Sequence, residues 1–231
     1  MFLLPLPLLK ALNSMDEQTK QSIIRLIHRE VIPAIGCTEP IAVALACAKA
    51  AEVLGDRPER VEVYLSANIL KNAMGVGIPG TGMVGLPIAI ALGSLIGRSA
   101  YGLEVLKDLS PEGLAAGKAM VERKCISIAL KEQVDKLYIE VVSHRGDEES
   151  RVVISHAHTH FSYIARNGEV LYNEESGASH EELEADEEIA LNFGLVYDFA
   201  MQMPLEEIRF ILETARVNEA AAKASMEAGC Y

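Results

Sequence analysis

Cys37 is the side chain with the clearest chemical potential in the sequence. It stands in the string Gly36-Cys37-Thr38-Glu39-Pro40, where Thr38 or Glu39 can cap a helix whose first turn contains Pro40. Backbone N–H groups and the helix dipole favour negative charge at such a start, so we expect a stabilised thiolate there. A thiolate binds metals and attacks electrophiles. The alternative is a small buried apolar side chain, which is the usual position of a free cysteine.

The second candidate is a glycine-rich segment between an expected strand and an expected helix. Five glycines fall between Gly75 and Gly85, and glycine lets the backbone approach a ligand closely. Free N–H groups ahead of a helix form an anion site, which would suit the carboxylate of a small substrate. The side chains that accompany this segment are polar: Ser66, Asn68, Lys71, Asn72 and Thr81.

Other interpretations of the glycine-rich segment remain open or are disfavoured. A tight turn needed only for packing would use the same glycines. The pattern G-x-G-x-x-G occurs from Gly75 to Gly80, but Pro79 lies inside it and no parallel βαβ unit is apparent, so a dinucleotide site is not expected. A P-loop is not expected either, because Thr81 and not lysine follows Gly80.

The third candidate is the string His156-Ala157-His158-Thr159-His160. On a continuous strand the three imidazoles would share one face. Such a set can bind zinc or another divalent ion, as in a metal hydrolase. A solvated polar strand end and a His158 that contacts substrate are the two alternatives.

Net charge, cysteine spacing and the lengths of apolar runs exclude several classes of protein. The chain has 231 residues and a net charge of −12, with eight acids and no Lys or Arg between residues 174 and 188. No basic stripe is present, so no nucleic acid partner is expected. The four cysteines are widely spaced without a C-x-x-C motif, which favours a reducing cytoplasmic location over a disulfide framework. No uninterrupted apolar run reaches the length of about 18 residues that spans a membrane, so no membrane partner is expected.

Hydrophobic periodicity predicts an α+β fold. Helices are expected over residues 16–31, 40–54, 84–96, 103–107, 111–124, 189–201 and 205–228, and strands over 60–66, 125–130, 136–143, 151–157, 161–166 and 169–172. Helices, then a meander of strands, then helices indicate an antiparallel sheet of about four to five strands packed against helices from both ends of the chain. Residues 1–14 read as an apolar extension outside the fold, and residues 15–231 as a single domain.

Several strings resemble the L-cysteine desulfidase family, which overlaps with the serine dehydratase α-chain-like proteins. The resemblance extends from about Met15 onward and rests on Gly36–Ile41, Asn68, Lys71-Asn72, Gly75-Val76, Ile78–Ala89, Gly102–Asp108, His158-Thr159 and Arg209–Leu212. Family members are roughly twice as long, so the chain would correspond to the N-terminal half of the family architecture.

The resemblance implies a carbon–sulfur lyase that converts L-cysteine to pyruvate, ammonia and sulfide by α,β-elimination. It implies a 4Fe–4S cluster held by three cysteines in the complete enzyme, with Cys37 as the first ligand and the other two in the second half. Lys71 and His158 become candidates for the catalytic base or for the group that holds the substrate carboxylate. Substrate-binding candidates are Ser66, Asn68, Asn72, Gly80, Thr81 and Thr159.

Two alternatives to this function remain. The chain can be a non-catalytic fragment, or one subunit of a split enzyme that binds its missing half, and in either case it would be inactive alone. The second alternative is L-serine dehydratase activity, because serine is also a β-substituted amino acid. The expected partners are therefore a small amino-acid substrate, the missing C-terminal half or a second subunit, and in some arrangements a further copy of the chain.

Overall fold

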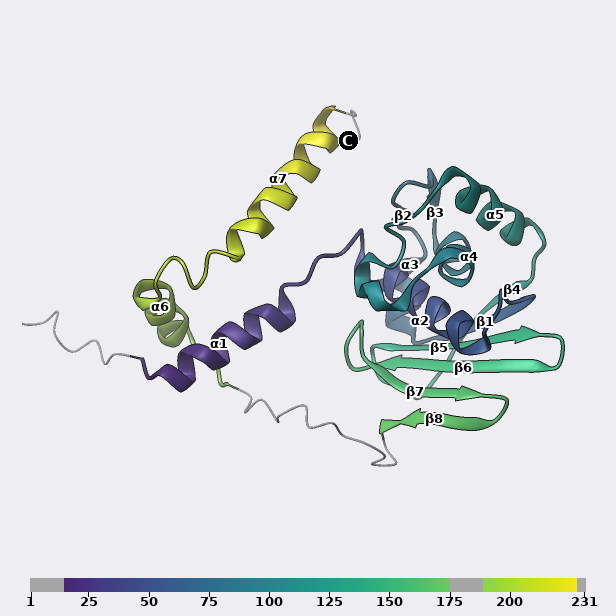
Figure 1. The fold of residues 1–231 in the computed structure, drawn as a ribbon, viewed down its shortest axis with the longest axis horizontal. Helices are drawn as coiled ribbons and strands as arrows, with labels where there is room; N and C mark the ends of the chain where they lie inside the picture. The colour runs from purple at the N-terminus through teal and green to yellow at the C-terminus, as the bar shows by residue number, and fades with distance from the viewer. Residues whose placement is uncertain (1–14, 175–188, 228–231) are drawn as a thin grey trace, which may run out of the picture. The chain divides into compact units, whose positions relative to one another are not determined.

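The computed structural model describes residues 15–174 and 189–227 (Figure 1). These residues form two compact units, one from residues 15–32 and 189–227 and the other from residues 33–174. The predicted extension over residues 1–14 and the predicted acidic loop after Glu174 lie outside the described residues.

The unit of residues 33–174 contains a six-stranded sheet in the order β4-β1-β5-β6-β7-β8. Its strands are β1 (Arg60–Leu65), β4 (Ile126–Leu130), β5 (Tyr138–Arg145), β6 (Glu148–Ser155), β7 (Phe161–Arg166) and β8 (Glu169–Asn173). All neighbours are antiparallel except β1 and β4, which pair in parallel from Val61↔Ile126 to Leu65↔Leu130. The α+β prediction is confirmed, with six strands instead of four to five and one parallel pair that the sequence did not indicate.

Helices cover one face of this sheet. They are α2 (Thr38–Leu54), α3 (Ala67–Ala73), α4 (Leu86–Ile96) and α5 (Pro111–Glu122), with a 3-10 helix, η2, at Ser99–Glu104. Most residues of α2 are buried, because the helix packs on the sheet with one side and on α4 with the other. Alternation in β1 places Val61, Val63 and Leu65 in this core.

A small ribbon of β2 (Gly77–Ile78) and β3 (Met83–Val84) connects α3 to α4. The glycine-rich segment is therefore a helix followed by a ribbon, where the sequence predicted a loop. Gly85, between the ribbon and α4, has a φ of 89° and a ψ of −179°, which only glycine adopts readily. A Cβ there would lie 2.8 Å from the Met74 carbonyl oxygen, so the ribbon returns tightly against the end of α3.

The second unit consists of α1 (Glu17–Glu30), α6 (Phe193–Gln202) and α7 (Ile211–Glu227). Asp16 caps α1 by accepting a hydrogen bond from the Thr19 N–H at 2.8 Å. Ile23, Phe199 and Met203 form its small core. Within the unit that contains the sheet, the helices that pack on it come from residues 38–122. None of the helices in the described ranges is long and apolar enough to cross a membrane.

Candidate functional site

The second and third candidate segments lie at the same end of the sheet. β1 and β6 run in the same direction, because both are antiparallel to β5 between them. Their C-terminal ends, followed by Ser66 and by the turn 156–160, therefore share an end of the sheet, called here the Ser66 end (Figure 1). The two strands are separated by one strand, about 10 Å.

Helix α2 brings Cys37 toward the same end. The Ala50 carbonyl accepts a hydrogen bond from the Ser150 hydroxyl at the start of β6, at 2.7 Å. The C-terminal part of α2 therefore lies over the opposite end of the sheet. Since 17 residues of α-helix span about 25 Å, the N-terminus of α2, with Cys37 as its cap residue, points toward the Ser66 end.

Cys37, Glu39 and Asn72 form the best-defined polar cluster of this region. The exposed Cys37 thiol donates to the Glu39 carboxylate at 3.2 Å, and the Asn72 amide donates to the other carboxylate oxygen at 3.1 Å. Thr38 adds a third hydrogen bond to Glu39 at 3.2 Å. These contacts tie the start of α2 to α3, so the structure brings together two of the predicted site residues through a carboxylate that sequence reasoning treated only as a cap.

The expectation of a stabilised thiolate at Cys37 is wrong for the described residues. Partial burial and the hydrogen bond to the Glu39 carboxylate raise the pKa of the Cys37 thiol. Burial also acts on Glu39, but its hydrogen bonds from Cys37, its own backbone and Asn72 outweigh that effect and lower the pKa of its carboxyl. Partial burial and a negative neighbour thus outweigh the helix N-terminus, and Cys37 holds its proton.

The ribbon between α3 and α4 packs against the Cys37 loop. A Cβ added to Gly36 would lie 2.9 Å from the Pro79 ring, so glycine is required for this approach. Gly80 has a φ of +74°, and a Cβ there would lie 3.2 Å from the Leu109 side chain. Gly80 is thus beside the Cys37 loop, as a substrate-facing residue would have to be.

Two predicted substrate-binding hydroxyls are engaged inside the fold. The buried Ser66 hydroxyl donates to the Lys136 carbonyl at 2.6 Å and accepts from the Ile69 N–H at 3.3 Å, which caps α3. The buried Thr81 hydroxyl donates to the Ile78 carbonyl at 2.6 Å and accepts from the Met83 N–H at 2.9 Å, which closes the ribbon turn. Both hydroxyls therefore stabilise the backbone of α3 and of the ribbon turn next to the candidate site.

Four other predicted residues remain open to a ligand. Asn68 and Lys71 are exposed on α3, Thr159 is exposed, and His158 is half-buried. Asn68 and Lys71 flank the cluster on the same helix as Asn72, whereas His158 and Thr159 reach the Ser66 end from the turn after β6. Contacts therefore join α2, α3 and the ribbon, and the turn 156–160 lies at the same end of the sheet.

The histidine string does not continue the strand. β6 ends at Ser155, His156 has a φ of 67°, and the chain turns before β7, so the prediction of three imidazoles on one strand face is wrong. His156 pairs with Asp135 at 3.4 Å and His160 with Glu174 at 3.5 Å. Sequence reasoning missed these carboxylates, which lie in other segments. The described residues contain no group of three side chains arranged to hold a metal ion.

The described cysteines do not fit a complete 4Fe–4S ligand set. Cys47 is ten residues along α2 from Cys37, about 15 Å, and its burial raises the pKa of its thiol to about 12. Cys125 precedes β4, which is parallel to β1, so it lies at the end of the sheet opposite Ser66. Only Cys37 among the described cysteines can serve as a ligand at the Ser66 end.

The chain is similar to proteins that are longer than it is. A UPF0597 protein of Parabacteroides distasonis is 69% identical over 214 residues, which is 92% of this chain and 50% of the relative. UPF0597 proteins of Bacteroides fragilis and Chromobacterium violaceum are 58% and 44% identical, over 92% and 88% of this chain and 50% and 47% of their own lengths. The chain thus spans about half the length of the relatives it matches. No family model matches it, and no solved structure gives a significant match.

Proposed function

We propose that this chain provides the substrate-facing half of a lyase of the L-cysteine desulfidase type. The observation that supports this most directly is the cluster of Cys37, Glu39 and Asn72 beside the Gly80 ribbon, since these residues lie within the strings that resemble the family. The relatives' twofold greater length supports the corollary that the site is completed by a second half or subunit.

The proposed reaction is an α,β-elimination. The Cα proton of L-cysteine is removed, the Cβ–S bond breaks with its electron pair leaving on sulfur, and water then releases ammonia from the resulting enamine to give pyruvate. Lys71 and His158 are the candidates for the group that takes the Cα proton or holds the carboxylate. Asn68, Asn72, Thr159 and the ribbon N–H groups would orient the amino acid.

A 4Fe–4S cluster belongs to this proposal only for the assembled protein. Cys37 would contribute one ligand, and the other ligands would have to come from outside the described residues. The described cysteines are free thiols, in keeping with the further proposal of a reducing, cytoplasmic location.

Anaerobic reconstitution of the full-length Parabacteroides distasonis relative and of this chain, side by side, tests the proposal. We expect the relative to release sulfide and pyruvate in equal amounts from L-cysteine, and this chain alone to release neither. Ammonia and pyruvate from L-serine but no sulfide from L-cysteine would establish the dehydratase alternative. No turnover of either amino acid by a cluster-loaded relative would overturn the lyase proposal.

Substitution of Lys71 tests the assignment of roles. In the chain complemented to activity by the second half, Lys71→Ala should abolish turnover, whereas Lys118→Ala, at an exposed position of α5 outside the candidate site, should leave it unchanged. Normal turnover by Lys71→Ala would remove this residue from the mechanism and leave His158 as the candidate.

A further inference from the structure

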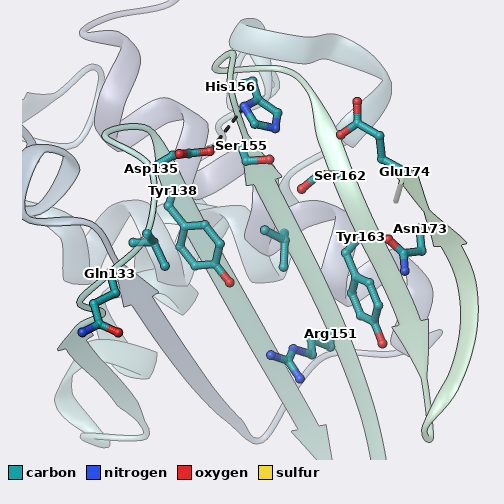
Figure 2. Close-up of a pocket in the computed structure, with 12 residues that line it drawn as sticks. Gln133, Asp135, Tyr138, Arg151, Ser155, His156, Ser162, Tyr163, Asn173 and Glu174 are labelled. Carbon is teal, nitrogen blue, oxygen red and sulfur yellow. Dashed lines mark ion pairs between the residues drawn. The ribbon is translucent and has the colours of Figure 1, made fainter. Parts of the chain in front are cut away.

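A pocket of about 690 Å³ lies on the face of the sheet that the helices of its own unit do not cover (Figure 2). Val153 of β6 lines it, between Tyr138 of β5 and Tyr163 of β7. Tyr163 pairs with Val153, whereas Tyr138 pairs with Ser155, so the two tyrosines lie on strands two spacings apart, about 10 Å, and are offset by two residues along the sheet. The pocket is therefore a slot with an apolar residue at its centre and aromatic walls, separate from the Cys37 cluster.

One end of the slot is cationic. Arg151 lies against the Tyr163 ring, with its guanidinium carbon 5.7 Å from the ring centre, and pairs with Glu140 beneath it. Glu140 also pairs with Lys131, so Arg151 shares this carboxylate with a second cation. Only 4% of the Glu140 side chain is exposed, whereas 44% of Arg151 is. The buried acid fixes the guanidinium while leaving it open to an anion.

The other end of the slot is acidic. Asp135 and Glu174 line it with their carboxylates, partnered by His156 and His160. Figure 2 shows Asp135, His156 and Glu174 at the end away from Arg151. The Ser155 and Ser162 side chains also line this part of the pocket. A cationic group would therefore be favoured here.

The separation of the two ends determines the size of the ligand. Arg151 and Ser155 are four residues apart on β6, about 13 Å along the strand. A single amino acid carries its ammonium and carboxylate on one carbon and cannot reach both ends. An extended peptide covers about 3.3–3.6 Å per residue, so three or four residues match the slot.

We propose that this pocket binds a short peptide with free termini, three or four residues long. Its C-terminal carboxylate pairs with Arg151, its N-terminal ammonium lies at Asp135 and Glu174, and its central part packs between Tyr138 and Tyr163 over Val153. Nothing in the lyase proposal requires this site, and peptide binding is measured on the chain without any cluster.

Trialanine is the probe that tests the peptide site. In ¹⁵N-detected NMR titrations of the whole chain we expect saturable shifts of the pocket residues, with a dissociation constant of about 1 mM or lower. C-terminal amidation or N-terminal acetylation should each weaken binding about tenfold, the loss expected for one charged hydrogen bond. Free alanine should not saturate the site.

Matched variants locate the binding. Arg151→Gln and Asp135→Asn should each weaken trialanine binding about tenfold, whereas Arg123→Gln and Asp147→Asn, outside the pocket lining, should bind like the wild type. The blocked peptides give the same information on unaltered protein if a variant fails to fold. Absence of saturation by trialanine, equal binding of blocked and free peptides, or equal binding of alanine would each overturn the proposal.

Discussion

Gly93→Ala should destabilise the unit that carries the candidate site. Gly93 is the point where α4 meets α2, and a Cβ there would lie 2.3 Å from the Ala44 carbonyl oxygen and 2.8 Å from the Ala44 Cα. Ordinary contact would require the two helix backbones to separate by about 1 Å, and a gap of that size forfeits a quarter to a half of each dispersion contact along the interface.

The size of the effect follows from two opposing contributions. Overpacking costs about 1–3 kcal/mol, and the upper value applies because backbone and not a flexible side chain is in the way. The higher helix propensity of alanine offsets about 1 kcal/mol of this cost. The net loss is therefore about 2 kcal/mol, which lowers the urea midpoint by about 1 M for a slope of roughly 2 kcal/mol/M.

Circular dichroism during urea unfolding measures this loss. Gly113→Ala is the matched control, because its Cβ would meet the Ile96 side chain at 3.2 Å and that methyl group can move. The control should stay within about 0.5 kcal/mol of the wild type. If Gly93→Ala unfolds at the wild-type midpoint with an unchanged slope, the close α2–α4 contact is not a determinant of stability and the reasoning fails.

Two further predictions concern ionisable groups. Burial raises the pKa of Glu140, but hydrogen bonds and charge from Lys131 outweigh it and lower that pKa below 4.5, so the pair stabilises the fold near neutral pH and this contribution is lost as the pH falls through the lowered value. Glu140→Gln should lower the free energy of unfolding by about 1–3 kcal/mol at pH 7. Below pH 4.5 the urea midpoint of this variant should fall less steeply with pH than that of the wild type. Equal slopes for the two proteins would contradict this. Iodoacetamide should modify the exposed Cys37 of the native protein slowly, because partial burial and Glu39 raise the pKa of its thiol. It should not modify Cys47, which is buried and has a pKa of about 12. Equal labelling of the two cysteines, measured by mass spectrometry, would refute this assignment.

Local signals in the sequence were sufficient where neighbouring residues determine the structure. Alternating side chains in Arg60–Leu65 correctly predicted a strand with one buried face. Gly55, in the left-handed region at a φ of 87°, ends α2 as expected. Asn167 and Gly168, both with positive φ, form the turn between β7 and β8 that their dipeptide predicts.

Non-local pairing and competition between local signals account for the failures. Helix α3 has only seven residues before a run of glycines, so its periodicity was too short to recognise. The parallel contact of β4 with β1 joins residues about sixty positions apart, and no local pattern encodes it. Asp135 and His156 meet only because β5 and β6 form a hairpin, so the sequence alone could not show that the histidine string has acidic partners.

The described hydrogen bonds to the Glu39 carboxylate come from uncharged side chains. Glu39 accepts hydrogen bonds from Cys37, Thr38 and Asn72, all of which are neutral donors, so the carboxylate keeps its charge and holds the Cys37 proton. A cation close to the sulfur would reverse this effect, because an opposite charge within about 4–6 Å favours the ionised thiol. If the lyase proposal is correct, a cationic group from Lys71 or from the second half must therefore reach Cys37 in addition to further thiols, and Cys37 should react with iodoacetamide faster in the complemented protein than in this chain alone.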